Sequence, residues 1–491
     1  MPFEDFREYI ERCRQLGEVK DIDGADWNLE IGAITEVMET KYPDDHPMLL
    51  FDNIKGYPKG YRVASNIMNT PKRTALALDI PENVSKVELL KIWKEKIHTF
   101  EPLPPREVSD GPVKENIDTG DKVDLFKFPT PKWHELDGGR YLGTACMVIT
   151  RDPEEGWVNL GVYRLQIHNK NTLGLYISPG HHGSIMERKY WSKGKSCPVA
   201  VTFGQEPAVW IAATYAVRYG TSEYDWAGWA RGKAVDVVRG PVTDLPIPAT
   251  SEIVIEGELP PPDKESMVEG PFGEWPGYYA HGARTEPIIK VKSVMYRNNP
   301  IIAGAPPIKP TTLYSHGIPF GAAVLWDTLE KAGIQDVKGV WTYFCSTSGG
   351  GGLPFIVISL KQRYVGHAKQ ALLVAAGARS GGYLGRYVIV VDEDIDPTNL
   401  PDVMWAVASR SDPATSVDIA RDTWSTYLDP RIPPWKRDRG DLTNSKALIN
   451  ACRPFDWIDQ FPPVNSISPE LKEKTLAKWG NLFNRQSVRN N

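Results

Sequence analysis

The chain has 491 residues, far more than one ordinary domain needs, so two or three domains with large cores are expected. Lys and Arg number 57 against 62 Asp and Glu, and the formal net charge of -5 excludes the basic character typical of nucleic-acid-binding proteins. Five scattered cysteines without a CxxC pair indicate reduced thiols. The N-terminus is charged and amphipathic, and no apolar run reaches the roughly 18 residues of a membrane span. We therefore expect a cytoplasmic protein.

The first part of the chain has apolar residues at helical spacing. This pattern predicts helices over 3–16, 28–40 and 86–98, with a short strand over 19–22. The proline-rich, charged stretch 101–112 predicts a linker. An N-terminal α/β region over 1–112 is therefore expected.

The middle of the chain is rich in β-branched residues, and the last third alternates between helix and strand. Strands of an antiparallel sheet or barrel are predicted over 142–150, 157–167, 173–178, 198–204, 252–259 and 287–296. Two helices are predicted between them, over 184–192 and 222–232. After residue 310 the alternation predicts an α/β unit, followed by a last helix over 469–480 that we expect to pack on a neighbouring subunit.

The most unusual local sequence is EGPFGEWPGYY at 269–279, which places Glu269 and Glu274 on either side of a Gly-Pro-Phe-Gly turn. The glycines allow the backbone to approach a ligand, and the turn can direct both carboxylates into one cavity. Two solvated acids on a hairpin loop are the plain interpretation, but exposed loops rarely carry so many aromatic residues. A carboxylate among aromatic rings has a raised pKa, which suits a general acid.

The segment GWVNLGVYRLQIH at 156–168 contains Asn159 and Arg164. The two residues are five positions apart, and an odd number of positions places two side chains on opposite faces of an ideal strand. They can serve one ligand only if the strand bends, which Gly161 permits. The alternative is a structural or solvated arginine on an edge strand.

Two short segments contain candidate metal ligands. SPGHHGS at 178–184 has adjacent histidines on a turn, either surface residues or ligands that join oxygen donors at a metal. In TSEYDW at 221–226, Glu223 opens a predicted helix and is either a first-turn acid or a ligand.

These four segments, in this order, resemble the UbiD family of decarboxylases, which use prenylated flavin mononucleotide (FMN). The match runs from about residue 5 to 460, with EGPFGE intact at 269–274. The resemblance implies an N-terminal α/β region at 1–112, a central split β-barrel flavin-binding domain at 113–310, and a C-terminal α/β oligomerisation domain at 311–491.

The resemblance also implies metal ligands. In the family an Asn, a His and a Glu hold a divalent ion, usually Mn²⁺, that clamps the flavin phosphate; here they correspond to Asn159, His182 and Glu223. This donor set suits Mn²⁺ better than zinc. The family's turn and its spacing from Arg164 favour His182, whereas counting from Gly174 points to His181, which stays open as the alternative. The family also binds K⁺ through backbone carbonyls, bordered here by Trp157 and 212–223.

The family's catalytic Glu-Arg-Glu network corresponds to Glu269, Arg164 and Glu274, with Glu274 delivering the proton that replaces CO₂. The resemblance implies further cofactor contacts from Val162, Tyr163, Arg164, Gly183, Ser184 and Lys446. The substrate pocket is expected near 275–284, 305–320 and Lys446.

The implied activity is the reversible non-oxidative decarboxylation of an aromatic, heteroaromatic or α,β-unsaturated acid. The alternatives are the carboxylase direction, an aromatic acyl-CoA decarboxylase, and a non-catalytic flavin-binding subunit of a multi-subunit carboxylase. The intact Glu-Arg-Glu set argues against the last. The implied partners are a flavin prenyltransferase, which supplies the cofactor, and further copies of the chain in a homodimer or homohexamer.

Overall fold

The computed structural model contains two compact units, Met1–Cys452 and Arg453–Asn491. The structure describes residues 3–43, 45–81, 84–215, 217–309, 320–344, 354–382 and 384–480. Part of the expected substrate pocket, 310–319, and residue 216 of the expected K⁺ segment lie outside this range. No helix in the described ranges is long and apolar enough to cross a membrane.

The N-terminal region contains α1 (Phe6–Gln15), α2 (Glu30–Lys41), α3 (Pro71–Ala77) and α4 (Lys86–Ile97). The helix α1 begins where the Asp5 carboxylate accepts a hydrogen bond from the Glu8 N–H, and it buries Phe6, Tyr9, Ile10 and Cys13. A four-stranded sheet has the order β1 (Val19–Asp23), β2 (Met48–Asp52), β3 (Arg62–Ser65) and β17 (Ile301–Ala303). The strand β17 pairs in parallel with β3, so a strand from beyond residue 300 completes this sheet.

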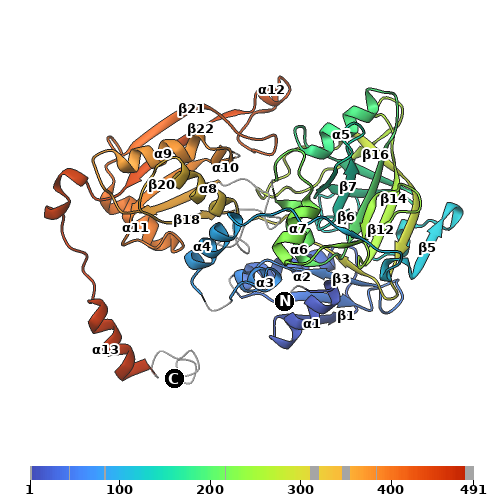
Figure 1. Ribbon diagram of the computed structural model, residues 1–491, viewed down its shortest axis with the longest axis horizontal. Helices are drawn as coiled ribbons and strands as arrows, with labels where there is room; N and C mark the ends of the chain where they lie inside the picture. Colours follow the sequence, from blue (N-terminus) through green and yellow to red (C-terminus); the bar gives the residue numbers. More distant parts are fainter. Residues whose placement is uncertain are drawn as a thin grey trace. The chain divides into compact units, whose positions relative to one another are not determined.

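The middle of the chain forms a large curled sheet, with α5 lying against it (Figure 1). Its main path runs in the order β6 (Tyr141–Gly143), β9 (Arg164–Asn169), β10 (Thr172–Tyr176), β16 (Arg284–Tyr296), β14 (Ile253–Leu259), β11 (Cys197–Phe203), β7 (Met147–Arg151) and β8 (Val158–Gly161). The strands β5 (Asn116–Thr119) and β15 (Ser266–Glu269) pair with β16 off this path. A small separate sheet contains β4 (Arg106–Glu107), β12 (Asp236–Arg239) and β13 (Pro246–Pro248).

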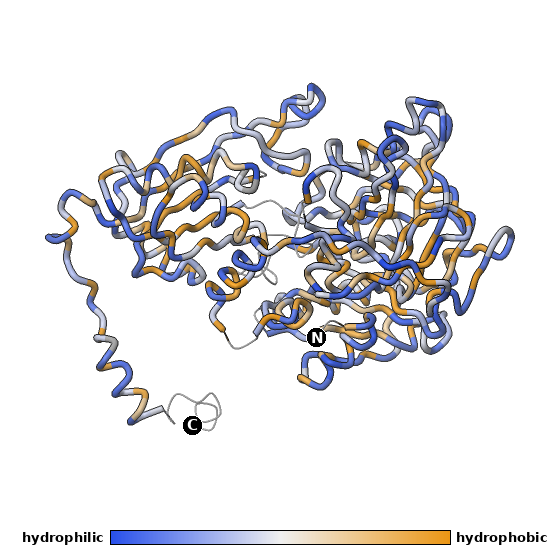
Figure 2. Tube along the Cα trace, in the orientation of Figure 1, coloured by the Kyte–Doolittle hydropathy of each residue, from blue (hydrophilic) through white to orange (hydrophobic). Residues whose placement is uncertain are grey.

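Three helices accompany the central sheet: α5 (His182–Trp191), α6 (Pro207–Thr214) and α7 (Glu223–Arg231). The helix α5 packs on β7, β8 and β11, and α7 contacts β8. The expected single strand over 142–150 is two strands, because the chain breaks between β6 and β7, where the Thr144 hydroxyl accepts a hydrogen bond from the Ala305 N–H. Figure 2 shows hydrophobic stretches following the strands and hydrophilic ones at the outer loops.

The C-terminal part of the first unit is an α/β sheet with the strand order β18 (Val337–Tyr343), β19 (Phe355–Leu360), β20 (Tyr387–Asp392), β22 (Thr443–Ala451) and β21 (Val417–Trp424). The three middle strands are parallel and the two edge strands antiparallel. The helices of this region are α8 (Phe320–Lys331), α9 (His367–Gly377), α10 (Arg379–Gly382), α11 (Leu400–Arg410) and α12 (Pro434–Arg437). The second unit contains α13 (Pro469–Trp479). The expected fold class is confirmed.

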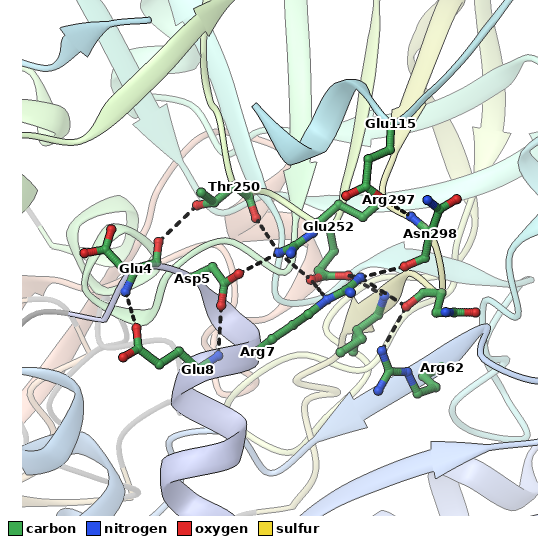
Figure 3. A network of polar contacts seen from close by, with 12 residues as sticks. Glu4, Asp5, Arg7, Glu8, Arg62, Glu115, Thr250, Glu252, Arg297 and Asn298 are labelled. Carbon is green, nitrogen blue, oxygen red and sulfur yellow. Dashed lines mark hydrogen bonds and ion pairs between the residues drawn. The ribbon is translucent and has the colours of Figure 1, made fainter. Parts of the chain in front are cut away.

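A buried polar network fastens α1 to the central sheet (Figure 3). The Arg7 guanidinium donates to both oxygens of Glu252, at 2.7 and 2.8 Å, and Glu252 is completely buried just before β14. Arg297, just after β16, donates to Glu252 at 3.2 Å and to Asp5 at 2.8 Å. The Ile301 N–H donates to the second Glu252 oxygen at 3.1 Å, so each oxygen of this carboxylate has more than one donor.

Candidate active site

Arg164, Glu269 and Glu274 form one cluster. Arg164 is the first residue of β9 and Glu269 the last of β15, and a four-residue turn leads from Glu269 to Glu274. The Arg164 Nε and Nη2 donate to the two oxygens of Glu269 at 2.9 and 2.7 Å, and Nη1 donates to Glu274. The Tyr141 hydroxyl also donates to Glu269, at 2.9 Å. One guanidinium therefore holds two carboxylates in fixed positions.

The turn between the two acids depends on close backbone approaches. Gly270 has a φ of +88°, which favours glycine, and its N–H donates to the Gln166 side-chain oxygen at 2.9 Å. The Gly138 N–H donates to the Pro271 carbonyl at 2.8 Å, and a Cβ at Gly138 would lie 1.9 Å from the Gly270 carbonyl oxygen. Only glycine fits at 138, so this contact fixes the turn that carries Glu274.

The cluster has two carboxylates and one guanidinium, and this excess of negative charge affects the pKa of Glu274. Burial raises the pKa of Glu274 to about 7, Arg164 opposes that rise, and the neighbouring Glu269 adds to it. The two carboxylates together raise the Arg164 pKa above its usual value, against the effect of burial. Near neutral pH, Glu274 can therefore both hold and release a proton, which a general acid requires.

Asn159, Glu223 and His182 form a second cluster on β8, α7 and α5. Asn159 and Glu223 are buried, and the Leu160 N–H donates to Glu223 at 2.7 Å. The His182 Nδ1 lies 4.0 Å from the other oxygen of Glu223. The strand β8 ends at Gly161 and β9 begins at Arg164, so the chain is interrupted between Asn159 and Arg164, which belong to different clusters.

These residues fit a divalent cation. Burial raises the pKa of Glu223 to about 8, and no Lys or Arg of the described chain forms an ion pair with it. Burial and the charge of Arg379 lower the pKa of His182, which favours the neutral imidazole that binds metals. No group of three or more His, Cys, Asp or Glu in the described ranges has metal-binding geometry, and this set has only two residues of those types.

The remaining predicted cofactor contacts lie around the start of α5. The Tyr163 ring packs against Gly183, where an added Cβ would lie 3.0 Å from it, and Ser184 is buried in the first turn of α5. Val162 is partly buried between β8 and β9. His181 precedes the helix with its ring facing Tyr163, whereas His182 faces Trp157 and Tyr219. Of the two histidines, His182 is the one within 4.0 Å of Glu223.

Lys446 lies in β22 of the C-terminal sheet and is buried. Its ammonium donates to the carbonyl oxygens of Ala376, at 2.9 Å, and Gly381, at 3.2 Å. Burial lowers its pKa to about 8. In the described chain it has no hydrogen bond to either cluster, so its contact with the cofactor stays a prediction.

A cavity of about 380 Å³ borders the loop that carries Glu274. Its wall contains aromatic rings, a lysine and a histidine, among them Trp133, His134, Glu274, Tyr278, Tyr279 and Lys309. Glu36 and Glu135 also line it, so its wall mixes apolar and charged groups, and its volume is in the range that accepts a small organic ligand.

The sequence did not single out two aromatic residues of the site. Tyr141 donates to Glu269, and the Tyr176 ring lies 4.6 Å from the Arg164 guanidinium carbon. Tyr176 is the direct cross-strand partner of Arg164, so the register of the β9–β10 hairpin would have predicted that the two side chains lie together. Tyr141 has no such local signal.

Three family models match consecutive parts of the chain. They describe the N-terminal domain, the Rift-related domain and the C-terminal domain of 3-octaprenyl-4-hydroxybenzoate carboxy-lyase (UbiD), and they match residues 10–93, 106–310 and 317–451. The chain is 34% identical over 441 residues to a phenolic acid decarboxylase of Bacillus subtilis, covering 88% of this chain and 90% of that protein. It is 33% identical to a pyrrole-2-carboxylic acid decarboxylase of Pseudomonas aeruginosa, covering 97% of each.

Solved structures agree over nearly the whole chain. The UbiD-class enzyme HmfF from Pelotomaculum thermopropionicum, in complex with FMN, is 30% identical with a TM-score of 0.83, covering 97% of this chain and 100% of that one. The vanillic acid decarboxylase of Sedimentibacter hydroxybenzoicus in open form is 28% identical with a TM-score of 0.81, covering 98% and 99%. The resemblance seen in the sequence is confirmed, and the chain belongs to the UbiD family of carboxy-lyases.

Proposed function

We propose that this carboxy-lyase removes CO₂ non-oxidatively from an aromatic, heteroaromatic or α,β-unsaturated acid, with prenylated FMN as its cofactor. The main support for this proposal is that Arg164 forms ion pairs with both Glu269 and Glu274, and that Glu274 lines a cavity. The phenolic and pyrrole acid decarboxylases among the relatives, and the HmfF structures with FMN and with prFMN, support the substrate class and the cofactor.

In this proposal Asn159, His182 and Glu223 hold the flavin phosphate through a divalent ion, Mn²⁺. The fit rests on a buried carboxylate that forms no ion pair with a Lys or Arg among the described residues, and on an imidazole 4.0 Å away. When bound, the prenylated flavin supplies the electron sink that cleavage at an sp² carbon requires. Backbone carbonyls near Trp157 would hold K⁺ beside the same phosphate.

The protein's own part in the reaction is to position one proton. Glu274, with a pKa of about 7, donates that proton to the carbon that carried the carboxylate. Arg164 holds Glu274 in place, and Glu269 fixes the orientation of the Arg164 fork through two further hydrogen bonds. Because one guanidinium bonds both acids, Glu274 is held in a defined position before the proton moves.

The proposal also concerns partners. A flavin prenyltransferase supplies the cofactor in the cytoplasm, and the chain works as a homodimer or homohexamer. Exposed apolar residues of α13 in the C-terminal unit support the oligomer, namely Leu471, Leu476 and Trp479. Such residues on one helix are typical of a surface that another chain covers.

Co-expression tests the proposal. Protein made without a flavin prenyltransferase should contain no cofactor or ordinary FMN and should be inactive, whereas co-expression should load prenylated FMN and give CO₂ release from a panel of aryl, heteroaryl and alkenyl acids. Mass spectrometry identifies the released cofactor. Equal activity without any flavin would contradict the proposal.

The metal assignment has its own test. His182→Ala should lose manganese and flavin together, whereas His181→Ala should retain most of both. Metal analysis and flavin absorbance measure the two losses, and the reverse ranking would assign the ligand to His181.

A further inference from the structure

A second arginine adjoins the cluster around Glu274. Arg284 opens β16 and is the direct cross-strand partner of Glu269. Its guanidinium carbon lies 4.3 Å from the Tyr176 ring centroid, and that of Arg164 lies 4.6 Å from the same ring. Arg284 does not bond to Glu269, whose oxygens accept from Arg164 and Tyr141. The site therefore contains a second cation that the Glu-Arg-Glu network does not use.

Arg284 is only partly engaged. Its Nε forms an ion pair with Glu286, whereas its Nη2 is buried and makes no hydrogen bond to the described residues. The Nε2 atom of His281 is also buried without a partner among the described residues. Buried donors without acceptors are unfavourable, so a ligand or water must meet them. Arg164, in contrast, bonds through all three of its nitrogens.

A third arginine contributes to the same place. The Arg437 Nη1 donates to the Ala280 carbonyl at 2.6 Å and its Nη2 to the Asp429 carbonyl, while its Nε is buried and unpaired within the described ranges. The Asp429 carboxylate is engaged by Arg386 and Ser425. Burial, with the charges of these arginines, lowers the pKa of His281 to about 4, so its ring is neutral near pH 7.

We infer that Arg284, His281 and Arg437 form a subsite for a second carboxylate of the substrate, the one that stays in the product. The inference rests on the proposed function and narrows its substrate class to dicarboxylic acids. A carboxylate offers two acceptor oxygens to a guanidinium fork, whereas a phenol hydroxyl brings its own donor to a place already rich in donors. Arg284 pairs with Glu286 and Glu274 pairs with Arg164, so we assign to Arg284 the carboxylate that stays in the product and not the one that a proton from Glu274 replaces.

Matched substrates test the inference on the cofactor-loaded enzyme. Benzene-1,4-dicarboxylate should be turned over with a kcat/KM at least about 10-fold above those of benzoate and 4-hydroxybenzoate. Arg284→Gln should lower that value for the dicarboxylate by about 10- to 100-fold, through KM. The two monoacids should change much less and by the same factor as each other, because for them only the influence of Arg284 on the Glu274 pKa is lost. His281→Gln, which retains the Arg284–Glu286 pair, should give a smaller loss with the same selectivity.

Lys290→Gln is the matched control. It removes one positive charge from the same strand, at an exposed pair with Glu265, and should change neither substrate class. Calorimetric binding of the dicarboxylate to FMN-loaded enzyme gives a second readout that needs no turnover. If binding depends on Arg284 but no acid is decarboxylated, the proposed function fails and the subsite stands.

Three results would overturn the inference. One is an equal loss for monoacids and the dicarboxylate in Arg284→Gln, and another is loss of flavin from that variant, which would assign these donors to the cofactor. The third is a wild-type preference for 4-hydroxybenzoate. If Arg284→Gln does not fold, His281→Gln decides the question by the same comparison.

Discussion

Two buried arginine–carboxylate clusters in this chain differ in how their charges are matched. In the network around Glu252 (Figure 3), two arginines, Arg7 and Arg297, meet two carboxylates, Glu252 and Asp5. In the cluster around Arg164, one arginine meets two carboxylates. Burial raises the pKa of both Glu252 and Glu274. At Glu252 two arginines and the Ile301 N–H oppose that rise, whereas at Glu274 the shared Arg164 opposes it and the neighbouring Glu269 adds to it, so that the Glu274 pKa is about 7.

The largest expected effect follows from removing that proton. Glu274→Gln still accepts a hydrogen bond from Arg164 but cannot release a proton near neutral pH. We expect kcat to fall about 10²- to 10⁴-fold while bound flavin and thermal stability are retained. CO₂ release and flavin absorbance measure the two properties. A variant that turns over near the wild-type rate would contradict the role given to Glu274.

Removing the shared cation should affect stability as well. Arg164→Met leaves two buried carboxylates facing each other, which should destabilise the fold by about 3–5 kcal/mol near neutral pH. Without Arg164 the pKa of Glu274 rises further, so the folded state binds more protons than the unfolded state and the loss should shrink as pH falls. Urea unfolding at pH 5 and pH 8 measures this. An equal loss at both pH values would refute the charge argument.

The matched network should tolerate the same substitution better. In Arg7→Met, Glu252 keeps its hydrogen bonds from Arg297 and the Ile301 N–H, so we expect a loss of about 1.5–3 kcal/mol. Because this network lies on α1 and outside the active-site cluster, kcat should be unchanged. Urea unfolding and CO₂ release test both statements, and a fall in kcat with retained folding would show that the two clusters are coupled.

The smallest expected effect is a shift in pH dependence. Glu269 raises the pKa of Glu274, and Arg164 lowers it. In Glu269→Gln the negative charge that raises the Glu274 pKa is gone, and Arg164 no longer divides its attraction between two carboxylates. The Glu274 pKa should therefore fall, by less than about one unit. The alkaline decline of kcat/KM should move to lower pH. A shift to higher pH would contradict the assigned charges.

The sequence predicted elements whose signal is local. Helical spacing predicted α1 over 3–16, and the structure has Phe6–Gln15; β-branched runs predicted the positions of β10, β11, β14 and β16. The helix α6 was not predicted, because all but its last residue are buried and it therefore has no polar face to create a period. The pairing of β17 with β3 joins residues 301 and 62, which no local pattern encodes.

The same distinction applies to the site. The interruption after Gly161 and the turn between Glu269 and Glu274 were visible in the sequence, because glycines mark both. The Tyr141 hydroxyl reaches Glu269 across 128 residues, so only the folded sheet shows this contact. The unused Nη2 of Arg284 was equally hidden, because burial and missing partners are properties of the structure alone.

The most direct test of the central claim is the pH dependence of kcat/KM for the cofactor-loaded wild-type enzyme beside Glu274→Gln. A proton donor must be protonated to act, and a carboxyl group with a pKa of about 7 loses its proton as pH rises through that value. The wild-type value should therefore be constant at lower pH and fall above about pH 7. The residual activity of Glu274→Gln should lack this decline. A wild-type profile that rises through pH 7, or a variant that keeps the same decline, would contradict Glu274 as the proton donor.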